Sequence, residues 1–435
     1  MANSAEPLEA DVIDLTHDGK GVADVDGRRL FVPGALSGER VKLLPRRRRR
    51  KLQEAELLEV VTPAPARADP PCAYFGRCGG CALQHLNYEA QVEFKEKVVQ
   101  DAFARIASLT PDRWLEPMTG PEWYYRRRAR LGVRYVAGKE RVLVGFKERS
   151  TRYVTDMLSC RVIERPLDGL PGSLAKLIGC TSLKQRLPQA EVSIGENARA
   201  VVLRVLEEPE PADLELFGEF GIENEIDIYL QRGGPGTVVP LTSERADRLT
   251  YRLPAFDVSL TFSPTDFVQV NSAINEQLVA RVVDLLDVAE TDRVLDLYCG
   301  LGNFSLPLAR RAESVLGVEG DAGLVARAAQ NARDNSLDNA RFVAADLSEP
   351  EWSFLRESWD LVVLDPSRSG ALVPVSQMSR MRPRKIAYVS CHPATLARDA
   401  KELVESQGYR LVTAGIADMF PHTHHVEVMA VFERR

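Results

Sequence analysis

From residue 271 onward, short apolar segments alternate with amphipathic helical patterns, and no other feature constrains the fold as strongly. The stretch from Asn271 to Leu286 places Ile274, Leu278 and Val282 on one side of a helix. Five apolar segments follow it, at Val294–Leu297, Val315–Val318, Phe342–Ala344, Leu361–Leu364 and Ile386–Val389. Strands that alternate with helices predict a doubly wound, Rossmann-like α/β sheet, which binds ligands at the carboxyl ends of its strands.

The first sixty residues have a different pattern. Short β-rich segments at 10–15, 29–32, 39–43 and 54–61 are separated by glycines, which predicts a small OB-like β-barrel over residues 1–62. The Pro-rich stretch 62–66 indicates a domain boundary. Mixed strand and helix patterns then predict a central α/β domain at 63–264, followed by the doubly wound domain at 265–435.

The charge distribution points to a polyanionic partner although the formal net charge is −6. Residues 28–51 hold ten basic side chains and one acidic one, and residues 121–149 hold nine basic and three acidic. The alternative for the run 46–50 is a solvated loop, and the acidic stretch 205–228 is expected to be a solvated face. No apolar run reaches the roughly 18 residues of a membrane span. The N-terminus shows no secretory signal, so we expect a cytoplasmic protein without a membrane partner.

A glycine-rich loop, Asp296–Asn303, follows the first predicted strand of the sheet. Carboxylates stand at the ends of the next three strands, at Glu319, Asp346 and Asp365. Glu319 is placed to accept hydrogen bonds from ribose hydroxyls. The loop lacks the third glycine of a dinucleotide site and the Lys-Ser/Thr pair of a phosphate-binding loop. A nucleoside without a polyphosphate fits best, so we expect S-adenosylmethionine; the alternative is that the acidic residues merely cap helices.

A cysteine, Cys391, ends the fifth strand, and the stretch 418–427 brings a carboxylate, Glu427, and three histidines. A thiol and a base that face each other fit methylation of a pyrimidine at C5. The thiolate of Cys391 adds to C6, C5 takes the methyl group, and Glu427 removes the C5 proton. The competing interpretation is a metal site formed by the histidines, His422, His424 and His425.

Seven cysteines form an odd set, which argues against a disulfide framework. They are Cys72, Cys78, Cys81, Cys160, Cys180, Cys299 and Cys391. The first three crowd into ten residues and suggest metal ligands, while the last two belong to the predicted catalytic sheet. The fourth ligand is therefore expected to be Cys160 or Cys180. Four thiolates suit zinc or an iron–sulfur cluster, and the spacing does not choose between them.

Five stretches of the last 170 residues together resemble the RNA (uracil-5-)-methyltransferase family. They are Phe267–Asn271, Asp296–Phe304, Asp365–Gly370, Tyr388–Cys391 with Thr395–Asp399, and Asp418–Pro421 with His425–Glu427. The N-terminal barrel is similar to the RNA-binding TRAM domain. Barrel, cysteines and catalytic domain together resemble the bacterial members that act on 23S rRNA.

The resemblance implies further roles. Cys72, Cys78, Cys81 and Cys160 would hold a [4Fe-4S] cluster. Gln269, Tyr298, Asn303, Glu319, Asp346 and Asp365 would contact S-adenosylmethionine. The segment 89–117, which begins with a helix expected over 88–109, would pack on the catalytic domain. Two departures from the family pattern are Ser367, where a second proline is usual, and Asp346, where relatives carry Asn.

The implied activity is methylation of a specific uridine in 23S rRNA by a monomeric enzyme. Arginines at 126–128 and 130, beside Tyr124 and Tyr125, combine phosphate-binding charge with stacking surface. Alternation along a strand would let about half of them reach RNA. The alternatives are the same chemistry on transfer RNA or on another rRNA uridine, a non-catalytic RNA-binding or maturation role, and a zinc-stabilised methylase without iron.

Overall fold

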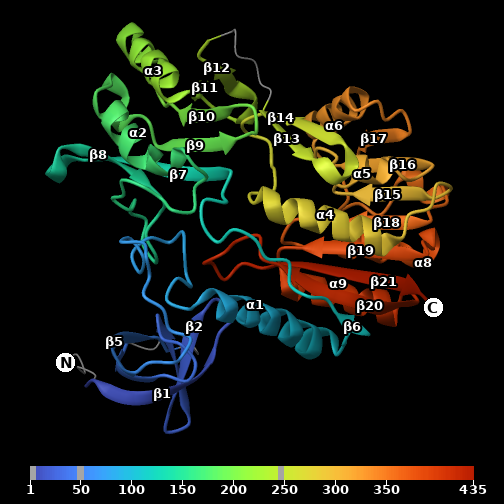
Figure 1. Ribbon diagram of the computed structural model, residues 1–435, viewed down its shortest axis with the longest axis horizontal. Helices are drawn as coiled ribbons and strands as arrows, with labels where there is room; N and C mark the ends of the chain where they lie inside the picture. The colour runs from blue at the N-terminus through green and yellow to red at the C-terminus, as the bar shows by residue number, and fades with distance from the viewer. Residues whose placement is uncertain (1–5, 47–52, 243–248) are drawn as a thin grey trace. The chain divides into compact units, whose positions relative to one another are not determined.

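The computed structural model describes residues 6–46, 53–242 and 249–435 and divides into two compact units (Figure 1). The first unit comprises Met1–Val98, Lys147–Tyr153 and Phe420–His425. The second comprises Val99–Phe146, Val154–Met419 and Val426–Arg435. Four of the five arginines in the predicted basic run 46–50 lie outside the described residues.

The N-terminal strands form one antiparallel sheet in the order β3-β2-β1-β4-β5. Their bounds are β1 Leu8–Leu15, β2 Lys20–Val25, β3 Arg28–Pro33, β4 Arg40–Pro45 and β5 Ala55–Thr62. A bridge between Phe31 and Glu54 joins the two edges, so the sheet closes on itself. The sequence analysis did not predict β2, because it took Gly21 as a turn residue. A Cβ at Gly21 would lie 2.9 Å from the carbonyl oxygen of Ala35, so this glycine allows close packing inside a strand.

A buried ion pair anchors the segment that follows the barrel. The Glu39 carboxylate, 1 % exposed, accepts hydrogen bonds from the Leu36 amide at 2.8 Å and from the Arg67 guanidinium at 2.8 Å. Arg67 also donates to the carbonyl of Gly34 at 2.8 Å. Burial raises the pKa of Glu39, but the hydrogen bonds from Arg67 and Leu36 outweigh it, so the pKa lies below its ordinary value.

We expect Glu39→Gln to lower the free energy of unfolding by about 2 kcal/mol at pH 7, because Arg67 loses its buried partner. A carboxylate with a depressed pKa in the folded state stabilises above its unfolded pKa and loses that effect as pH falls. The difference between variant and wild type should therefore shrink as the pH is lowered through this range. Chemical denaturation at several pH values measures it. The control is Glu56→Gln, which breaks an exposed pair with Arg46 and should change stability by less than about 0.5 kcal/mol.

The second unit contains a six-stranded mixed sheet in the order β12-β11-β10-β9-β7-β8 and a separate β13-β14 hairpin. The bounds are β7 Arg128–Val136, β8 Arg141–Gly145, β9 Gln189–Ile194, β10 Arg199–Arg204, β11 Asp227–Gln231, β12 Val238–Pro240, β13 Leu249–Leu253 and β14 Val258–Phe262. Helix α2 (Leu170–Gly179) packs on β7 and β8, and α3 (Pro211–Asn224) packs on β11 and α2. The predicted mixture of strands and helices in this region is confirmed.

The eight-stranded sheet of the second unit has the order β17-β16-β15-β18-β19-β21-β20-β6. Its strands are β6 Arg113–Trp114, β15 Arg293–Leu297, β16 Ser314–Glu319, β17 Ala340–Ala344, β18 Leu361–Leu364, β19 Lys385–Ser390, β20 Tyr409–Ala417 and β21 Glu427–Arg434. All five strands predicted from apolar segments are confirmed. Strand β21 runs antiparallel to both of its neighbours, β19 and β20.

Helices cover both faces of this sheet, as the doubly wound prediction requires. They are α4 Ser272–Leu286, α5 Ser305–Ala309, α6 Ala322–Asp334, α7 Leu372–Val375, α8 Met378–Met381 and α9 Pro393–Glu405. Both α4 and α9 pack on β19 and β21. The predicted helix at 271–286 is confirmed, with Asn271 accepting a hydrogen bond from the Ile274 amide as its N-cap. Within the described ranges, no helix is long and apolar enough to cross a membrane.

The remaining helical segments are short, apart from α1 (Tyr88–Ala102). The predicted helix at 88–109 ends early, because the chain changes to a π-helical turn, η1 (Phe103–Ala107), and Ser108 adopts a left-handed φ of 55°. The η1 turn packs on α9, and Phe103 meets Trp114 of β6 edge-on at 6.0 Å. The 3₁₀ turns are η2 Ala137–Lys139, η3 Leu167–Gly169, η4 Ser182–Gln185, η5 Pro235–Thr237, η6 Pro254–Phe256 and η7 Ser353–Arg356.

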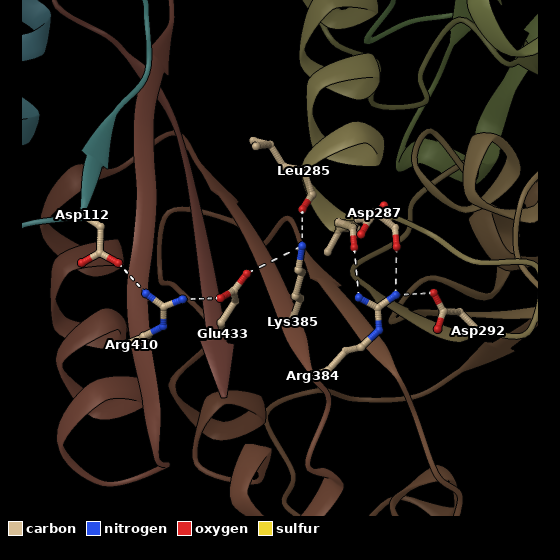
Figure 2. Close-up of polar contacts among 9 residues, drawn as sticks. Asp112, Leu285, Asp287, Asp292, Arg384, Lys385, Arg410 and Glu433 are labelled. Atoms are coloured by element: carbon tan, nitrogen blue, oxygen red, sulfur yellow. Dashed lines mark hydrogen bonds and ion pairs between the residues drawn. The ribbon is translucent and has the colours of Figure 1, made fainter. Parts of the chain in front are cut away.

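Cations at the amino end of β19 bind the carboxyl end of α4 (Figure 2). Arg384 donates to the carbonyl of Asp287 at 2.9 Å, and the Lys385 ammonium donates to the carbonyl of Leu285 at 3.1 Å. These carbonyls lie at a helix end that has no intrahelical donors left for them. Figure 2 also shows an ion-pair chain across the strands through Lys385, Glu433, Arg410 and Asp112. Hydrogen bonds and ion pairs of charged side chains thus hold this edge of the sheet together. The candidate site lies at the opposite edge.

Candidate active site

Six polar side chains stand in a row along the carboxyl edge of the eight-stranded sheet. Strands β17, β16, β15, β18, β19 and β21 are neighbours in that order. At or just beyond the end of each, in the same order, are Asp346, Glu319, Tyr298, Asp365, Cys391 and Glu427. The first five strands are parallel, so their carboxyl ends meet at one edge. Because β21 runs the other way, its first residue, Glu427, joins them there.

The strand register brings Cys391 and Glu427 side by side. Ser390 on β19 pairs with Val428 on β21. One residue further toward the edge, Cys391 therefore stands opposite Glu427. Cys391 is half-buried and Glu427 is 4 % exposed. The sequence analysis predicted that a thiol and a carboxylate face each other across one pocket, and the strand pairing brings them together.

Both groups hold their protons more tightly than usual. Burial raises the pKa of the Cys391 thiol, the nearby Glu427 carboxylate raises it further, and the Arg368 guanidinium opposes the shift. Burial also raises the pKa of Glu427 well above its usual value, with a second contribution from Asp365 and opposition from Arg368. Arg368 is thus the cation that favours the ionised form of both groups.

Two further carboxylates continue this cluster inward. Burial, followed by the charge of Asp296, raises the pKa of Asp365 to about 7. Burial also raises the pKa of Asp296 to about 7, against the hydrogen bond from Ser305. Perturbed carboxylates grouped at one edge of a sheet are typical of a catalytic site.

A cavity of about 580 Å³ lies at the same edge. Its lining residues are Tyr298, Glu319, Gly320, Asp346, Leu347, Ser348, Ser369, Gly370, Ala371, Leu372, Val373, Pro374 and Arg398. The glycine-rich loop bends sharply beside it, with left-handed φ angles of 54° at Gly300 and 93° at Gly302. Glu319 accepts a hydrogen bond from the Gly300 amide at 3.2 Å and one from the Gly320 amide at 2.7 Å. The volume and the carboxylate suit a nucleoside ligand.

Three of the six residues expected to contact the cofactor line this cavity, and three do not. Tyr298, Glu319 and Asp346 are among the lining residues, whereas Gln269, Asn303 and Asp365 are not. The Asn303 amide instead pairs reciprocally with the Asn275 amide, at 2.9 Å in both directions, and accepts from the Tyr251 hydroxyl at 3.0 Å. Asn303 therefore ties the glycine-rich loop to α4 and β13.

The sequence analysis gave no cofactor role to residues 369–374 or to Arg398, which form one wall of the cavity. The stretch 365–370 and the helix that holds Arg398 were recognised as motifs, but no local pattern shows that they meet. Gly370, which has a left-handed φ of 80°, marks a tight turn in the stretch 365–370.

Comparison with known proteins identifies the family. Residues 246–435 match the family model described as tRNA (Uracil-5-)-methyltransferase. The "23S rRNA (uracil(1939)-C(5))-methyltransferase RlmD" of Methylococcus capsulatus is 48% identical over 432 residues, which cover 99% of this chain and 98% of that protein. The protein of the same name from Nitrosococcus oceani is 47% identical over 435 residues, 99% of this chain and 97% of that one. The chain belongs to the RNA uracil-C5 methyltransferase family.

A solved structure of this family supports the fold. The Pyrococcus abyssi tRNA (uracil-54, C5)-methyltransferase, in complex with S-adenosyl-L-homocysteine, is similar with a TM-score of 0.75 and 27% sequence identity. The similarity covers 98% of this chain and 99% of that one. The family resemblance found in the sequence is therefore confirmed.

The three clustered cysteines of this uracil-C5 methyltransferase lie in the first unit, and Cys160 lies in the second. The backbones of Cys78 and Glu148 form an isolated antiparallel β-bridge, and the Arg149 guanidinium donates to the carbonyl of Cys81. No disulfide bond joins any of the seven cysteines, all of which lie within the described residues. Within residues 6–46, 53–242 and 249–435, no group of three or more His, Cys, Asp or Glu side chains is arranged to hold a metal ion. The four-cysteine site stays a prediction.

The histidines of the C-terminal stretch have packing roles within the first unit. The backbone carbonyl of His422 accepts from the amides of Ala82 and Leu83, and its ring Nδ1 lies 3.3 Å from the Gln91 amide nitrogen. His424 and His425 have ring centroids 4.3 Å apart. The metal site considered for these histidines is not seen among the described residues.

The arginines at and just before the start of β7 are mostly engaged by the protein itself. Arg127 pairs with Glu164 at 3.0 Å, and Arg128 donates to the carbonyl of Thr265 at 2.7 Å. Both side chains are less than one-fifth exposed, whereas Arg130 is 66% exposed. Tyr125 is buried. Arg130 keeps the exposure expected of an RNA contact, and neither Arg127 nor Arg128 does, because carboxylates and backbone carbonyls of the protein bind their charges.

Proposed function

We propose that this chain transfers a methyl group from S-adenosylmethionine to C5 of a specific uridine in 23S rRNA. The observation that carries the proposal is the placement of Cys391 opposite Glu427 at the edge of the catalytic sheet. The RNA class is supported by the names of the relatives that align over nearly the whole chain.

The reaction follows from the chemistry of these two side chains. The Cys391 thiolate adds to C6 of the uracil ring, and the electron pair of the C5–C6 double bond moves onto C5 and O4. The cofactor supplies an electrophilic methyl group, which C5 attacks. Glu427 then removes the proton from C5, the double bond re-forms, and the Cys391 sulfur leaves as a thiolate. Arg368 favours both ionised states, the thiolate before addition and the carboxylate before proton removal.

We also propose that Gln269, Tyr298, Asn303, Glu319, Asp346 and Asp365 form the cofactor site. The cavity lined by Tyr298, Glu319 and Asp346 supports the first contacts. Gln269, Asn303 and Asp365 do not line this cavity. They would contact a bound cofactor that extends toward Cys391, or act on it indirectly through the glycine-rich loop.

We expect Glu319→Ala to weaken binding of S-adenosylhomocysteine about 100-fold, because two charge-assisted hydrogen bonds to the ribose hydroxyls are lost. Isothermal titration calorimetry on the full chain measures the change. Glu313→Ala is the matched control, since Glu313 is an exposed glutamate just before the opposite end of the same strand. Equal affinity of Glu319→Ala and wild type would contradict the ribose contact.

We further propose the domain assignment of 1–62 as a TRAM RNA-binding barrel, 63–264 as a central domain and 265–435 as the catalytic domain. The closed five-stranded sheet supports the first of these. We also propose that the chain acts as a monomer.

We propose that Cys72, Cys78, Cys81 and Cys160 hold a [4Fe-4S] cluster. Three thiols within ten residues, beside the cation Arg149, support the proposal. Protein purified without oxygen should absorb broadly near 400 nm and contain about four irons per chain. Cys81→Ser should lose both signals and Cys180→Ser neither. Stoichiometric zinc would favour the zinc-stabilised alternative.

Mapping of 5-methyluridine in the RNA of a strain that lacks this protein tests the function as a whole. We expect one modified uridine to disappear from 23S rRNA and to return with the wild-type chain. If a 5-methyluridine disappears from transfer RNA instead, the same chemistry takes place on transfer RNA. Unchanged methylation of all RNA would refute the enzymatic role.

A further inference from the structure

Asp399 is a fully buried carboxylate on α9 that no reaction step above uses. Its Oδ2 accepts hydrogen bonds from the Ala371 amide at 2.7 Å and from the Tyr388 hydroxyl at 2.7 Å. Its Oδ1 lies 2.8 Å from Nε and 2.7 Å from a terminal nitrogen of Arg398. Three parts of the site therefore meet at this carboxylate: the loop after β18, strand β19 and helix α9.

The loop after β18 rests directly on this carboxylate and its partner. Arg398 also donates to the carbonyl of Ser369 at 3.0 Å. A Cβ at Gly370 would lie 2.6 Å from the Asp399 carboxylate and 2.6 Å from the Arg398 guanidinium. The loop backbone at Gly370 therefore packs directly against these two residues, with no room for a side chain between them.

The loop after β18 contains a residue that acts on Cys391 and Glu427 and residues that line the cavity. Arg368, upstream of the turn, acts on Cys391 and Glu427. Residues 369–374, at and beyond the turn, form one wall of the cavity. Tyr388, which binds the other side of Asp399, lies three residues before Cys391 on β19.

We propose that Asp399 is a positioning residue that fixes the loop of Arg368 against β19, so that the guanidinium reaches Cys391 and Glu427. This inference rests on the proposed function for the roles of Cys391 and Glu427. Asp399 acts through Arg368 and touches no reacting atom itself. Its removal leaves the Ala371 amide, the Tyr388 hydroxyl and the Arg398 guanidinium without their shared acceptor, which frees the loop.

The reactivity of the Cys391 thiol tests the proposal without RNA or turnover. Glu427, Asp365 and Arg368 are charged groups that act on this thiol, and of these three Arg368 favours the thiolate. In the full chain with Asp399→Asn, alkylation of Cys391 by iodoacetamide, followed by peptide mass spectrometry, should slow about tenfold at pH 7.5. The pH profile of alkylation should move upward by about one unit, which is the equivalent of that factor.

A double-mutant cycle separates positioning from general loosening. Arg368→Gln alone should slow alkylation to a similar degree, and adding Asp399→Asn should change it little further, because the two residues act in series. Alkylation of Cys180, which is exposed on the C-cap of α2, should be unchanged throughout. Glu402→Gln is the matched control on the same helix, since the Glu402 carboxylate accepts hydrogen bonds from its neighbours Ser406 and Gln407.

Additive effects of Asp399→Asn and Arg368→Gln, or an unchanged pH profile in Asp399→Asn, would overturn the proposal. If Asp399→Asn does not fold, Tyr388→Phe removes one donor from the same carboxylate and should give a smaller shift in the same direction. An absence of that shift would also overturn it. Since alkylation requires no methyl transfer, this result is independent of the RNA mapping that tests the proposed function.

Discussion

Replacement of Cys391 by alanine should abolish methyl transfer and spare cofactor binding. Without the thiolate, C5 of uracil has too little electron density to attack a methyl sulfonium, so the rate should fall by at least about 10⁴-fold, equivalent to about 5.5 kcal/mol of transition-state stabilisation. The measurement is transfer of a labelled methyl group to unmodified 23S rRNA, with single-turnover kinetics to isolate the chemical step.

The affinity for the cofactor provides a control for this prediction. Cys391 is not among the residues that line it, so the affinity for S-adenosylhomocysteine should stay within about twofold of wild type. Cys180→Ala is the matched control, because Cys180 is exposed and lies outside the catalytic sheet. Turnover by Cys391→Ala within tenfold of wild type would remove the covalent mechanism.

Replacement of Glu427 by glutamine should trap the enzyme on its RNA. Glutamine has nearly the same shape but cannot take the C5 proton, so addition and methylation proceed and elimination stops. The charge of Glu427 also raises the pKa of Cys391, and its removal makes the thiolate easier to form. We therefore expect a stable protein–RNA adduct, visible as a shifted band on a denaturing gel, with turnover reduced by at least about a thousandfold.

Two variants make this result specific. Glu433→Gln changes a glutamate near the other end of the same strand, where it pairs with Lys385 and Arg410, and should give neither adduct nor loss of turnover. Cys391→Ala combined with Glu427→Gln should lose the adduct. An adduct that survives in this double variant would assign the covalent bond to another residue, and normal turnover of Glu427→Gln would remove its role as base.

The catalytic sheet was predictable because its signal is local. Each strand is a short apolar run, each is followed by a polar residue, and parallel strands align those residues at one edge. That logic correctly placed Glu319, Asp346, Asp365 and Cys391 at or just beyond strand ends, whereas Glu427 reaches the same edge because β21 runs antiparallel. It required no knowledge of which helix packs where.

The misses depend on tertiary contacts. Asn303 carries no local sign that it pairs with Asn275 on α4, and Gly21 looks like a turn glycine until Ala35 is seen packed against it. The arginines at and just before the start of β7 have the composition of an RNA-binding patch, yet Arg127 and Arg128 bind partners from distant segments. Sequence composition states which charges are present, and only packing decides which of them remain available.

The antiparallel position of β21 between β19 and β20 determines where insertions and deletions can occur without separating Cys391 from Glu427. Cys391 and Glu427 are 36 positions apart in the chain, yet continuous backbone hydrogen bonds between two central strands hold their side chains at one level. Lengthening the connection before Val426 leaves that spacing untouched. Adding a single amino acid within the first pairs of β21 would rotate the carboxylate to the opposite face of the sheet. Changes in the length of the connection before Val426 should therefore be tolerated. Insertions and deletions inside β21 should not.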